Sequence, residues 1–208
     1  NITTTVYLYI KQKPAYIGDG DYLYAWGAQL EEGSYPTSYI PTNGAAVTRS
    51  AETANGAGDA STFNDSEGVL MAEISALADD LSNRILSLSN GAYSNSTRIS
   101  YNTTSNSIEY RVVSSSSIQA QLIYALPDIK TNNKISVKYK SNDFALWING
   151  FKVATDLSGL TSIGLDRLNF DDGGGAADFY GKTKQIQYFQ TALTDSELEQ
   201  LTSWISFT

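Results

Sequence analysis

The sequence contains no cysteine and no histidine, and it has only four prolines and one methionine among its 208 residues. Without cysteine it has no disulfides and no thiolate metal sites, and redox chemistry does not indicate a compartment. Without histidine it has no Ser-His-Asp or Cys-His nucleophile arrangement and no imidazole-bound metal. These two absences exclude the commonest catalytic and metal-binding arrangements.

The chain also lacks long apolar runs and basic clusters. No stretch approaches the roughly 20 apolar residues that cross a bilayer, and the first residues do not have the basic and apolar regions of a signal peptide. Fourteen Lys and Arg against 22 Asp and Glu give a net charge of −8. This balance argues against a nucleic-acid partner. Because the sequence starts at Asn1 rather than at methionine, we expect a piece of a longer protein.

The clearest local signal is Asn149-Gly150 between two apolar runs, which predicts a two-residue β-hairpin with a type I′ turn. In that register Trp147 pairs with Lys152 and Leu146 with Val153. One face then carries an apolar set that predicts a buried surface. Its members are Phe144, Leu146, Ile148, Phe151 and Val153. The opposite face carries Ala145, Trp147, Lys152 and Ala154, and we expect a ligand there first.

Short alternating segments bounded by Gly, Asn, Asp or Ser predict further strands, and their spacing is typical of a β-sandwich. We predict strands at Val69–Leu77, Arg84–Leu88, Arg98–Tyr101, Ile108–Val113, Ile118–Tyr124, Ile135–Tyr139, Leu165–Phe170 and Thr183–Phe189. Period-two alternation points Ile99, Tyr101, Ile108, Tyr110, Val112, Ile118, Ala120, Leu122, Tyr124, Ile135, Val137 and Tyr139 inward. The polar residues between them then face outward.

One helix closes this otherwise all-β chain. Thr194 and Glu197 form a capping box, because each side chain satisfies a backbone amide that the first helical turn leaves unpaired. An apolar stripe follows at helical spacing, at Leu198, Leu201, Trp204 and Ile205.

Two segments carry a family resemblance. Trp26-Gly27-Ala28-Gln29-Leu30-Glu31-Glu32-Gly33, followed by residues 37–42 and 46–49, resembles a junction found in bacteriophage tail-fibre and other tail proteins. There, a carbohydrate-binding-module-like jelly roll meets a concanavalin A-like, or laminin G-like, domain. The stretch from residue 179 to 198, with the hairpin upstream, is similar to the end of such a domain.

The resemblance implies three parts. Residues 1–48 would hold the last strands of an upstream jelly roll and the junction, with strands at Val6–Ile10 and Tyr22–Leu30. Residues 49–67, small and polar, predict a surface linker. Residues 68–208 would form a concanavalin A-like jelly-roll β-sandwich. Alternatively, the first strands complete the sheet of the C-terminal domain.

Catalysis is not expected within this chain. Glycoside hydrolysis usually needs two carboxylates that face each other across the scissile bond, which on one strand means Asp or Glu two or four residues apart. Glu73 and Glu109 each stand alone on their predicted strands. We therefore expect a protein that is not an enzyme.

The candidate ligand-binding residues are those that offer a sugar ring an apolar platform or hydrogen bonds. Trp147 with Lys152 supplies the platform, unless Trp147 is buried beneath the C-terminal helix or an upstream domain. An outward polar row follows on the neighbouring strands, at Arg98, Asn102, Arg111, Gln119 and Gln121. If these strands share a sheet with the hairpin, the row can bind the same ligand. Otherwise it is a solvated face. Tyr93 lies in a polar loop, where it either recognises a ligand or anchors the loop.

A calcium site is a further possibility, although no cofactor is required. Asp171 and Asp172 in the loop Asp171-Asp172-Gly173-Gly174-Gly175 offer the hard oxygen ligands that Ca²⁺ takes. The resemblance implies calcium at a sheet rim, whereas Asp and Gly are also what a tight polar loop uses.

The leading functional hypothesis follows from the resemblance. It implies a receptor-binding region of a phage tail fibre that recognises a bacterial surface glycan, of lipopolysaccharide or capsule type, without catalysis. It also implies a homotrimer in the virion tail that contacts other tail proteins. The alternatives are a structural or assembly module of the fibre with no ligand of its own, and a carbohydrate-binding module of a secreted bacterial enzyme.

Overall fold

The computed structural model describes residues 29–30, 38–41, 43–48 and 55–204. The chain divides into two compact units; the described residues up to Thr48 belong to the first, and those from Asn55 onward belong to the second. The strand predicted at Val6–Ile10 lies outside the described residues, as does nearly all of that at Tyr22–Leu30. The upstream jelly-roll domain therefore stays a prediction.

Within the first unit, the side chain of Gln29 bridges to a segment about ten residues further on. Its Oε1 accepts a hydrogen bond of 2.7 Å from the amide of Ile40, and its Nε2 donates one of 3.4 Å to the carbonyl of Ser38. These residues belong to the two parts of the junction sequence that resembles tail proteins. The bonds give a local reason for a glutamine at this position.

The second unit is almost entirely strands. They are β1 (Asn55–Ala57), β2 (Glu67–Ala76), β3 (Arg84–Ser89), β4 (Ser96–Tyr101), β5 (Ser107–Ser114), β6 (Ser117–Ala125), β7 (Asn133–Lys140), β8 (Phe144–Ile148), β9 (Phe151–Asp156), β10 (Arg167–Asn169) and β11 (Gly181–Phe189). The helix α1 (Asp195–Thr202) follows β11. The strands predicted from Val69 onward are confirmed, with ends that differ by a few residues.

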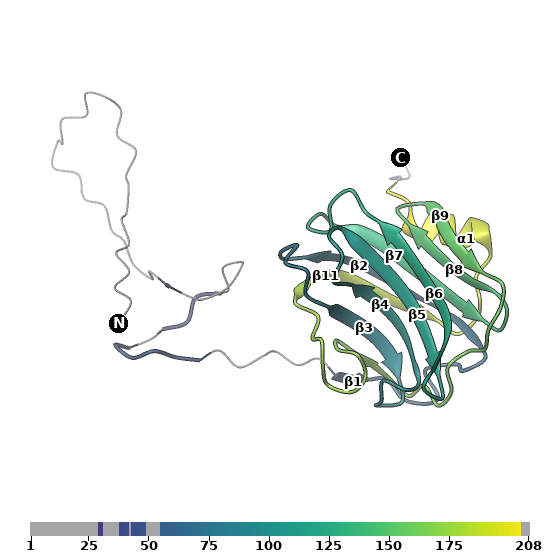
Figure 1. Ribbon diagram of the computed structural model, residues 1–208, viewed down its shortest axis with the longest axis horizontal. Coiled ribbons are helices and arrows are strands. Elements are labelled where there is room, and N and C mark those ends of the chain that lie inside the picture. The colour runs from purple at the N-terminus through teal and green to yellow at the C-terminus, as the bar shows by residue number, and fades with distance from the viewer. Residues whose placement is uncertain (1–28, 31–37, 42, 49–54, 205–208) are drawn as a thin grey trace, which may run out of the picture. The chain divides into compact units, whose positions relative to one another are not determined.

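Two antiparallel sheets pack face to face (Figure 1). One has six strands in the order β1-β10-β3-β4-β5-β6, and the other has five in the order β11-β2-β7-β8-β9. Each strand turns alternate side chains to the space between the sheets, so one contiguous apolar core forms there. The expected all-β sandwich with one short C-terminal helix is confirmed.

The core contains nearly all of the residues expected to point inward. Ile99, Tyr101, Ile108, Tyr110, Val112, Ile135, Val137 and Tyr139 are fully buried in it, with Ala120 and Leu122 nearly so. The tyrosine hydroxyls find partners at the margins of the core. That of Tyr110 donates to the carbonyl of Lys138 at 2.9 Å, and that of Tyr139 donates to the carbonyl of Asn64 at 2.7 Å. These buried tyrosine hydroxyls therefore keep a hydrogen-bond partner, so burying them costs little folding free energy.

The hairpin forms with the predicted turn and, near that turn, with the predicted register. Asn149 and Gly150 have φ values of 52° and 90°, and Trp147 pairs with Lys152. Farther out, the register shifts, and Leu146 pairs with Ala154 rather than with Val153. The prediction that Phe151 belongs to the core is wrong: Phe151 keeps its predicted pairing with Ile148 next to the turn, but it lies on the edge strand β9 and is 72% exposed. Val153 is partly buried against the core.

A second irregularity lies at the start of β6. The pairing of β5 with β6 shifts register between Val112 and Val113, which leaves Gln119 without a Cα partner. Because a shift of one residue moves a side chain to the other face, Ile118 points outward and is 54% exposed. The prediction that it faces the core is wrong. Tyr124, also predicted inward, lies on this edge strand and is 39% exposed.

The predicted linker contributes to the sandwich. Residues 55–57 form β1, which pairs with β10, and the nearby side chain of Phe63 is buried in the core. Phe63 stacks edge-on against Tyr188 with ring centroids 4.9 Å apart. The polar composition of this segment gave no periodic signal, because a three-residue strand is too short to show one.

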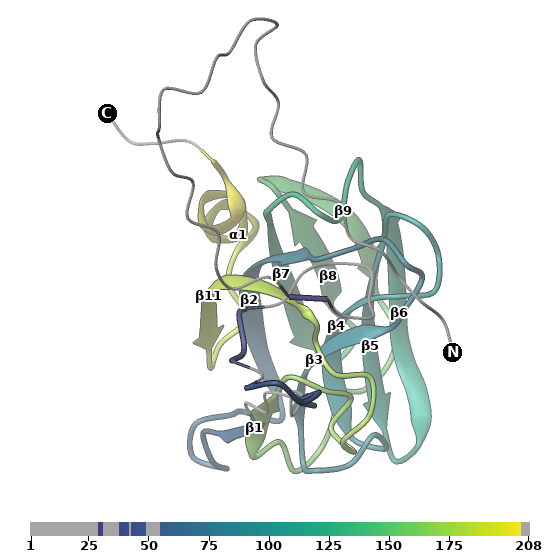
Figure 2. The same ribbon diagram turned by 90° about the vertical axis from the view of Figure 1, so that its left-hand side faces the viewer.

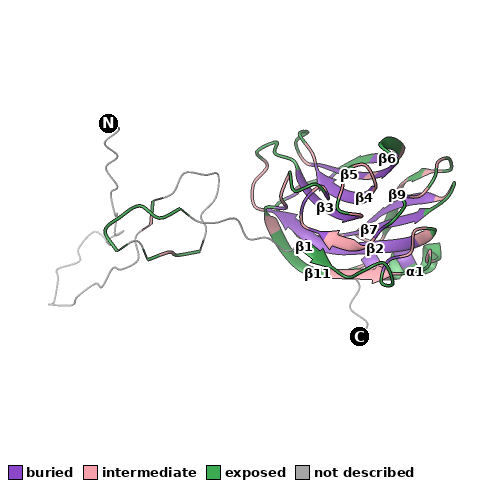
Figure 3. Ribbon diagram, turned by 90° about the horizontal axis from the view of Figure 1, so that it is seen from below, coloured by how far each residue is buried: buried purple, intermediate pink, exposed green. Residues whose placement is uncertain are grey.

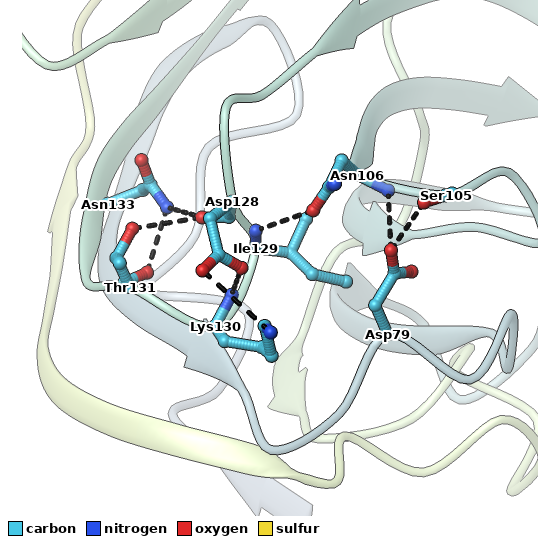
Figure 4. A network of polar contacts seen from close by, with 8 residues as sticks. All are labelled: Asp79, Ser105, Asn106, Asp128, Ile129, Lys130, Thr131 and Asn133. Atoms are coloured by element: carbon cyan, nitrogen blue, oxygen red, sulfur yellow. Dashed lines mark hydrogen bonds and ion pairs between the residues drawn. The ribbon is translucent and has the colours of Figure 1, made fainter.

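Three loops at one end of the sandwich are joined by a polar network (Figure 4). The carboxylate of Asp79, after β2, accepts hydrogen bonds from the Ser105 hydroxyl and the Asn106 amide in the β4–β5 loop. The side-chain oxygen of Asn106 then accepts the amide of Ile129 after β6, at 3.1 Å. Asp128 continues the network to Thr131 and Asn133. These contacts give the polar groups of the three loops hydrogen-bond partners where the loops cover this end of the core.

The helix α1 covers part of the outer face of the five-stranded sheet. The capping box of Thr194 and Glu197 forms as predicted. Leu198 is buried in a second apolar cluster with Val69, Ala145 and Trp147. Figure 3 shows the buried side of this sheet and the helix lying against it. No helix in the described part of the chain has the length and apolar content needed to cross a membrane.

Asn149 joins the hairpin turn to two other elements, and its replacement tests that role. Its Oδ1 accepts hydrogen bonds from the amide of Lys134 and from Nε1 of Trp204, each at 2.9 Å. We expect Asn149→Ala to lower the free energy of unfolding by roughly 2–3 kcal/mol, through lost bonds and a positive φ that alanine disfavours. Asn149→Gly loses the bonds but tolerates the backbone, so it should cost about 1 kcal/mol less. Equal losses in urea denaturation would contradict this account.

Candidate ligand-binding site

The outer face of the six-stranded sheet carries a cluster of charged side chains from β4 and β5. Arg98 on β4 is the direct cross-strand partner of Arg111 on β5. Two like charges directly opposite each other destabilise a sheet pair. This arrangement therefore has a cost to folding, and one carboxylate, that of Glu109, offsets only part of it.

Glu109 neutralises Arg111 through short contacts. Its Oε1 accepts 2.6 Å from Nε of Arg111 and 2.7 Å from Nε2 of Gln121 on β6. Glu109 is 6% exposed, so this ion pair is largely shielded from water. The pair fixes the plane of the Arg111 guanidinium, whose side chain remains 24% exposed.

Arg98 has no such carboxylate partner. Its residue is 2% exposed, and its Nη2 is buried with no hydrogen-bond partner among the described residues. Its guanidinium instead lies 4.0 Å from the centroid of the Tyr93 ring. A guanidinium over an aromatic face is held there by a cation–π interaction.

Tyr93 completes the cluster from the loop between β3 and β4. It is 46% exposed, and its hydroxyl accepts a hydrogen bond of 3.2 Å from Nη1 of Arg111. The interaction with the Arg98 guanidinium, aided by Arg111, holds the pKa of the Tyr93 hydroxyl below its ordinary value, against the opposing effect of partial burial. The tyrosine thus joins both cations at the surface.

The loop that carries Tyr93 is fastened to the turn between β5 and β6. Oδ1 of Asn95 accepts the amide of Ser115 at 2.8 Å, and the carbonyl of Ser94 accepts the amide of Ser116 at 2.9 Å. Ser115 and Ser116 both have positive φ, 50° and 66°. Non-glycine residues held in this region store strain, and here the strained turn positions the Tyr93 loop.

The structure separates the other predicted ligand residues from this cluster. Most of the polar row lies on β4 to β6 of the six-stranded sheet and the hairpin lies in the five-stranded sheet, so the condition under which the row would serve the hairpin's ligand is not met. Asn102 follows the end of β4 and accepts the amide of Thr104. Gln119 sits at the β6 register shift, where its Oε1 accepts the amide of Leu160 at 3.1 Å.

The prediction that Trp147 offers an exposed platform is wrong. Trp147 is 5% exposed because Leu198 and the rest of α1 cover the outer face of β8. Lys152 lies 5.7 Å from the Trp147 ring centroid and forms an ion pair with Asp195 at the start of the helix. The alternative in which the tryptophan lies beneath the C-terminal helix is therefore confirmed.

The two aspartates proposed for calcium bind amides of their own loop. Asp171 is buried, and its Oδ1 accepts the amide of Gly173 at 2.7 Å. Oδ1 of Asp172 accepts the amides of Gly174 and Ala176. Nowhere in the described part of the chain do three Asp or Glu side chains converge as a cation site requires. Calcium binding at Asp171 and Asp172 stays a prediction.

Sequence reasoning placed Tyr93, Arg98 and Arg111 among the candidates, and the structure brings these three together. It missed the part played by Glu109, which had been considered only as a lone catalytic carboxylate. The spacing Glu109-x-Arg111 was a usable signal, because residues two apart on a strand share a face. The contact of Tyr93 with the strands depends on the path of its loop, and the alternation of residues in the sequence does not predict that path.

Solved structures share this fold. A carbohydrate-binding module of the Ruminococcus gnavus intramolecular trans-sialidase, bound to α2,3-sialyllactose, matches with a TM-score of 0.58 and 16% identity, covering 74% of this chain and 97% of that one. A leech intramolecular trans-sialidase matches with a TM-score of 0.56 and 17% identity, over 69% of this chain and 24% of that one. The binding domain of botulinum neurotoxin DC, in complex with rat synaptotagmin II, matches with a TM-score of 0.51 and 13% identity, over 66% and 35%.

At these identities the likeness shows the fold alone. The chain spans about a quarter of the length of the leech enzyme, so it corresponds to one part of that larger protein. No protein-family model matches the chain, and no curated protein matches it in sequence. The chain thus has the jelly-roll β-sandwich fold found in carbohydrate-binding modules.

The lowered pKa of Tyr93 gives a direct test of the cluster. Since the two guanidinium groups favour the phenolate, Tyr93 should ionise at lower pH than an ordinary tyrosine. The buried Tyr101, Tyr110 and Tyr139, whose pKa values are raised by desolvation, should ionise later. In an ultraviolet titration, Tyr93→Phe should remove the earliest part of the absorbance change. An unchanged early phase in this variant would show that the arginines do not act on Tyr93.

Proposed function

We propose that this chain binds an acidic glycan, without catalysis, on the outer face of its six-stranded sheet. The observation that carries the proposal is the pair of opposed arginines, Arg98 and Arg111, of which Arg111 keeps a side chain that is 24% exposed. Two like charges directly opposite each other destabilise a sheet pair, and an anionic acceptor at the exposed guanidinium offsets that cost. The carboxylate of an acidic sugar supplies such an acceptor.

The surroundings of the two arginines suit a sugar. Arginine binds a carboxylate through paired N–H donors, which gives both strength and orientation. Tyr93 supplies a half-exposed aromatic surface, and the exposed Ile123 is the cross-strand partner of Glu109 on the same face. A pyranose ring packs its C–H groups on such surfaces while polar groups fix its hydroxyls.

The charge of the cluster limits the ligand further. Arg98 and Arg111 contribute two positive charges and Glu109 one negative charge, so one positive charge remains unbalanced. A single carboxylate, as in a sialic or uronic acid, balances it, whereas a phosphate monoester, with nearly two negative charges at pH 7, exceeds it. Sialyllactose, the ligand named for the R. gnavus module, carries one such carboxylate.

The cluster supports recognition rather than hydrolysis. It holds one carboxylate, and that carboxylate is engaged by Arg111 and Gln121. Hydrolysis of a glycoside by the common route takes two carboxylates flanking the bond, one of them able to donate a proton. Binding by itself needs only the donors and the apolar surface that the sheet presents.

For the biological setting, two proposals remain. The junction sequence supports a receptor-binding region of a phage tail fibre that acts outside the host cell on a bacterial surface polysaccharide of lipopolysaccharide or capsule type. The shared fold with sialidase modules supports a carbohydrate-binding module of a secreted bacterial enzyme. The homotrimer and the tail-protein partners that the resemblance implies stay predictions, and so does a purely structural role in the fibre.

Binding to 3′-sialyllactose and to lactose, measured by isothermal titration calorimetry, tests the proposal. We expect the acidic sugar alone to bind, and Arg111→Gln to weaken it tenfold or more, since a charged hydrogen bond is worth about 1.5–3 kcal/mol. Lys130→Gln removes the same charge from an exposed lysine in the β6–β7 loop and should leave the affinity unchanged. Equal binding of lactose, or equal losses in both variants, would refute an acidic-glycan site.

Glu109 should set the preference for a single negative charge. Glu109→Gln keeps the shape of the side chain and raises the net charge of the cluster by one. We expect this variant to gain affinity for a phosphorylated sugar, whose phosphate carries nearly two negative charges, relative to sialyllactose, measured as a ratio of the two dissociation constants. A ratio equal to that of the unmodified chain would show that charge balance does not select the ligand.

A further inference from the structure

The four edges of the two sheets are not protected equally. An edge strand exposes unpaired backbone N–H and C=O groups, and proteins usually protect it by brevity, bulges or lysines. β1 has three residues. β9 pairs through a register shift and carries Lys152 and Asp156. β11 carries Lys182 and Lys184, with a register shift between Thr183 and Gln185. Each of these edges carries at least one recognised device against pairing with another chain.

The fourth edge, β6, is long and uncharged. Its nine residues, Ser117–Ala125, contain no charged side chain and no proline. In the described part of the chain it pairs with β5 and lies at the end of the six-stranded sheet, at its outer margin in Figure 2. Ile123 is 55% exposed and Tyr124 39%, so apolar side chains accompany the open backbone edge. Such an edge favours pairing with another strand.

The first part of β6 contacts the segment that follows β9. The register shift lies near Gln119, whose side chain binds the amide of Leu160. Gly159 also packs here, since a Cβ at that position would lie 2.3 Å from the Gln119 carbonyl oxygen. Part of β6 also lies close to β9, the edge strand of the other sheet, although no ladder joins the two strands. From Gln121 to Ala125 the pairing with β5 is regular, and Ile123 and Tyr124 within this segment are exposed, so this is the segment that a partner would meet.

We propose that the partner is a second copy of this chain, paired through β6 in antiparallel fashion about a two-fold axis at Ile123. An antiparallel pair of identical strands is symmetric, so each open N–H of one copy meets a C=O of the other. Because β6 carries no charge, self-pairing places no like charges opposite each other. Ile123 of the two copies would then face each other across the axis.

The geometry of this pair has a functional consequence, and this step rests on the proposed function. A two-fold axis perpendicular to the joined sheet keeps the outer faces of both copies on the same side. The two clusters of Tyr93, Arg98 and Arg111 would then face one glycan-bearing surface together. Two linked weak sites gain avidity without any new contact. The dimer itself does not depend on glycan binding.

The mass of the full chain in solution, measured by light scattering during size-exclusion chromatography, tests the pairing. We expect the dimer of the 22.6 kDa chain, dissociating on dilution. Ile123→Lys should shift it to the monomer, whereas Phe151→Lys, a matched change at an exposed apolar residue of another edge strand, should leave it dimeric. Unmodified chain that is monomeric, or trimeric as the resemblance implies, overturns the proposal. Equal effects of the two variants on the mass would also overturn it.

A cysteine placed on the axis tests the arrangement. The chain has no cysteine, so Ile123→Cys introduces a single thiol. Directly opposed residues of an antiparallel pair lie within the Cα distance that a disulfide spans. Mild oxidation should join this variant into covalent dimers much faster than Phe151→Cys. Similar rates would overturn the β6 arrangement. A dimer that fails to bind sialyllactose would remove the proposed function and leave the pairing intact.

Discussion

The arrangement of this domain depends on how the outer face of the five-stranded sheet is covered. The alternation of β8 that buries Leu146 in the core also turns Ala145 and Trp147 outward. An exposed tryptophan and its aliphatic neighbours would leave a large apolar surface in water. The capped helix α1 covers them through Leu198, and the turn at Asn149 binds Trp204 just after the helix. The outer face of the six-stranded sheet carries the opposed Arg98 and Arg111, on which the proposed glycan site rests.

Several features of that second face lower the stability of the fold, and the proposed ligand would offset part of this cost. Opposed arginines at Arg98 and Arg111, a buried donor without a partner, and a strained Ser115-Ser116 turn each cost stability. Costs concentrated in one place are typical of sites whose groups are arranged for a partner outside the chain. Glu109 reduces the repulsion without removing it, which leaves one unbalanced positive charge in a chain of net charge −8.

Much of the fold could be predicted from the sequence, because period-two alternation and turn residues are local signals. The Asn149-Gly150 turn, the capping box at Thr194 and the core-facing residues of β4, β5 and β7 followed from them. Bulges are not visible in this way: one near Val153 shifts the register of the hairpin, and another near Gln119 turns Ile118 outward. The short strand β1 was mistaken for linker because three residues show no period.

The site was predicted in part, for a related reason. Alternation placed Arg98 and Arg111 on an outward face, but it does not state which sheet a strand joins. The sequence therefore leaves open whether the outward face of the hairpin, with Trp147, belongs to the same surface. Whether an outward aromatic is free or covered depends on where the last helix docks, which is a tertiary contact. Tyr93 was identified as a candidate, while its position over Arg98 depends on the path of a loop.

The most direct test of the account is to observe the arginine side chains during binding. In the nuclear magnetic resonance spectrum of labelled chain, the Nε–Hε signals of Arg98 and Arg111 report on each guanidinium separately. Addition of 3′-sialyllactose should shift both signals, while the indole signal of Trp147 beneath α1 and the Nε–Hε signal of Arg84 stay in place. Shifts confined to other residues, or no shift at saturating sugar, would contradict the claim that the opposed arginines form a glycan site.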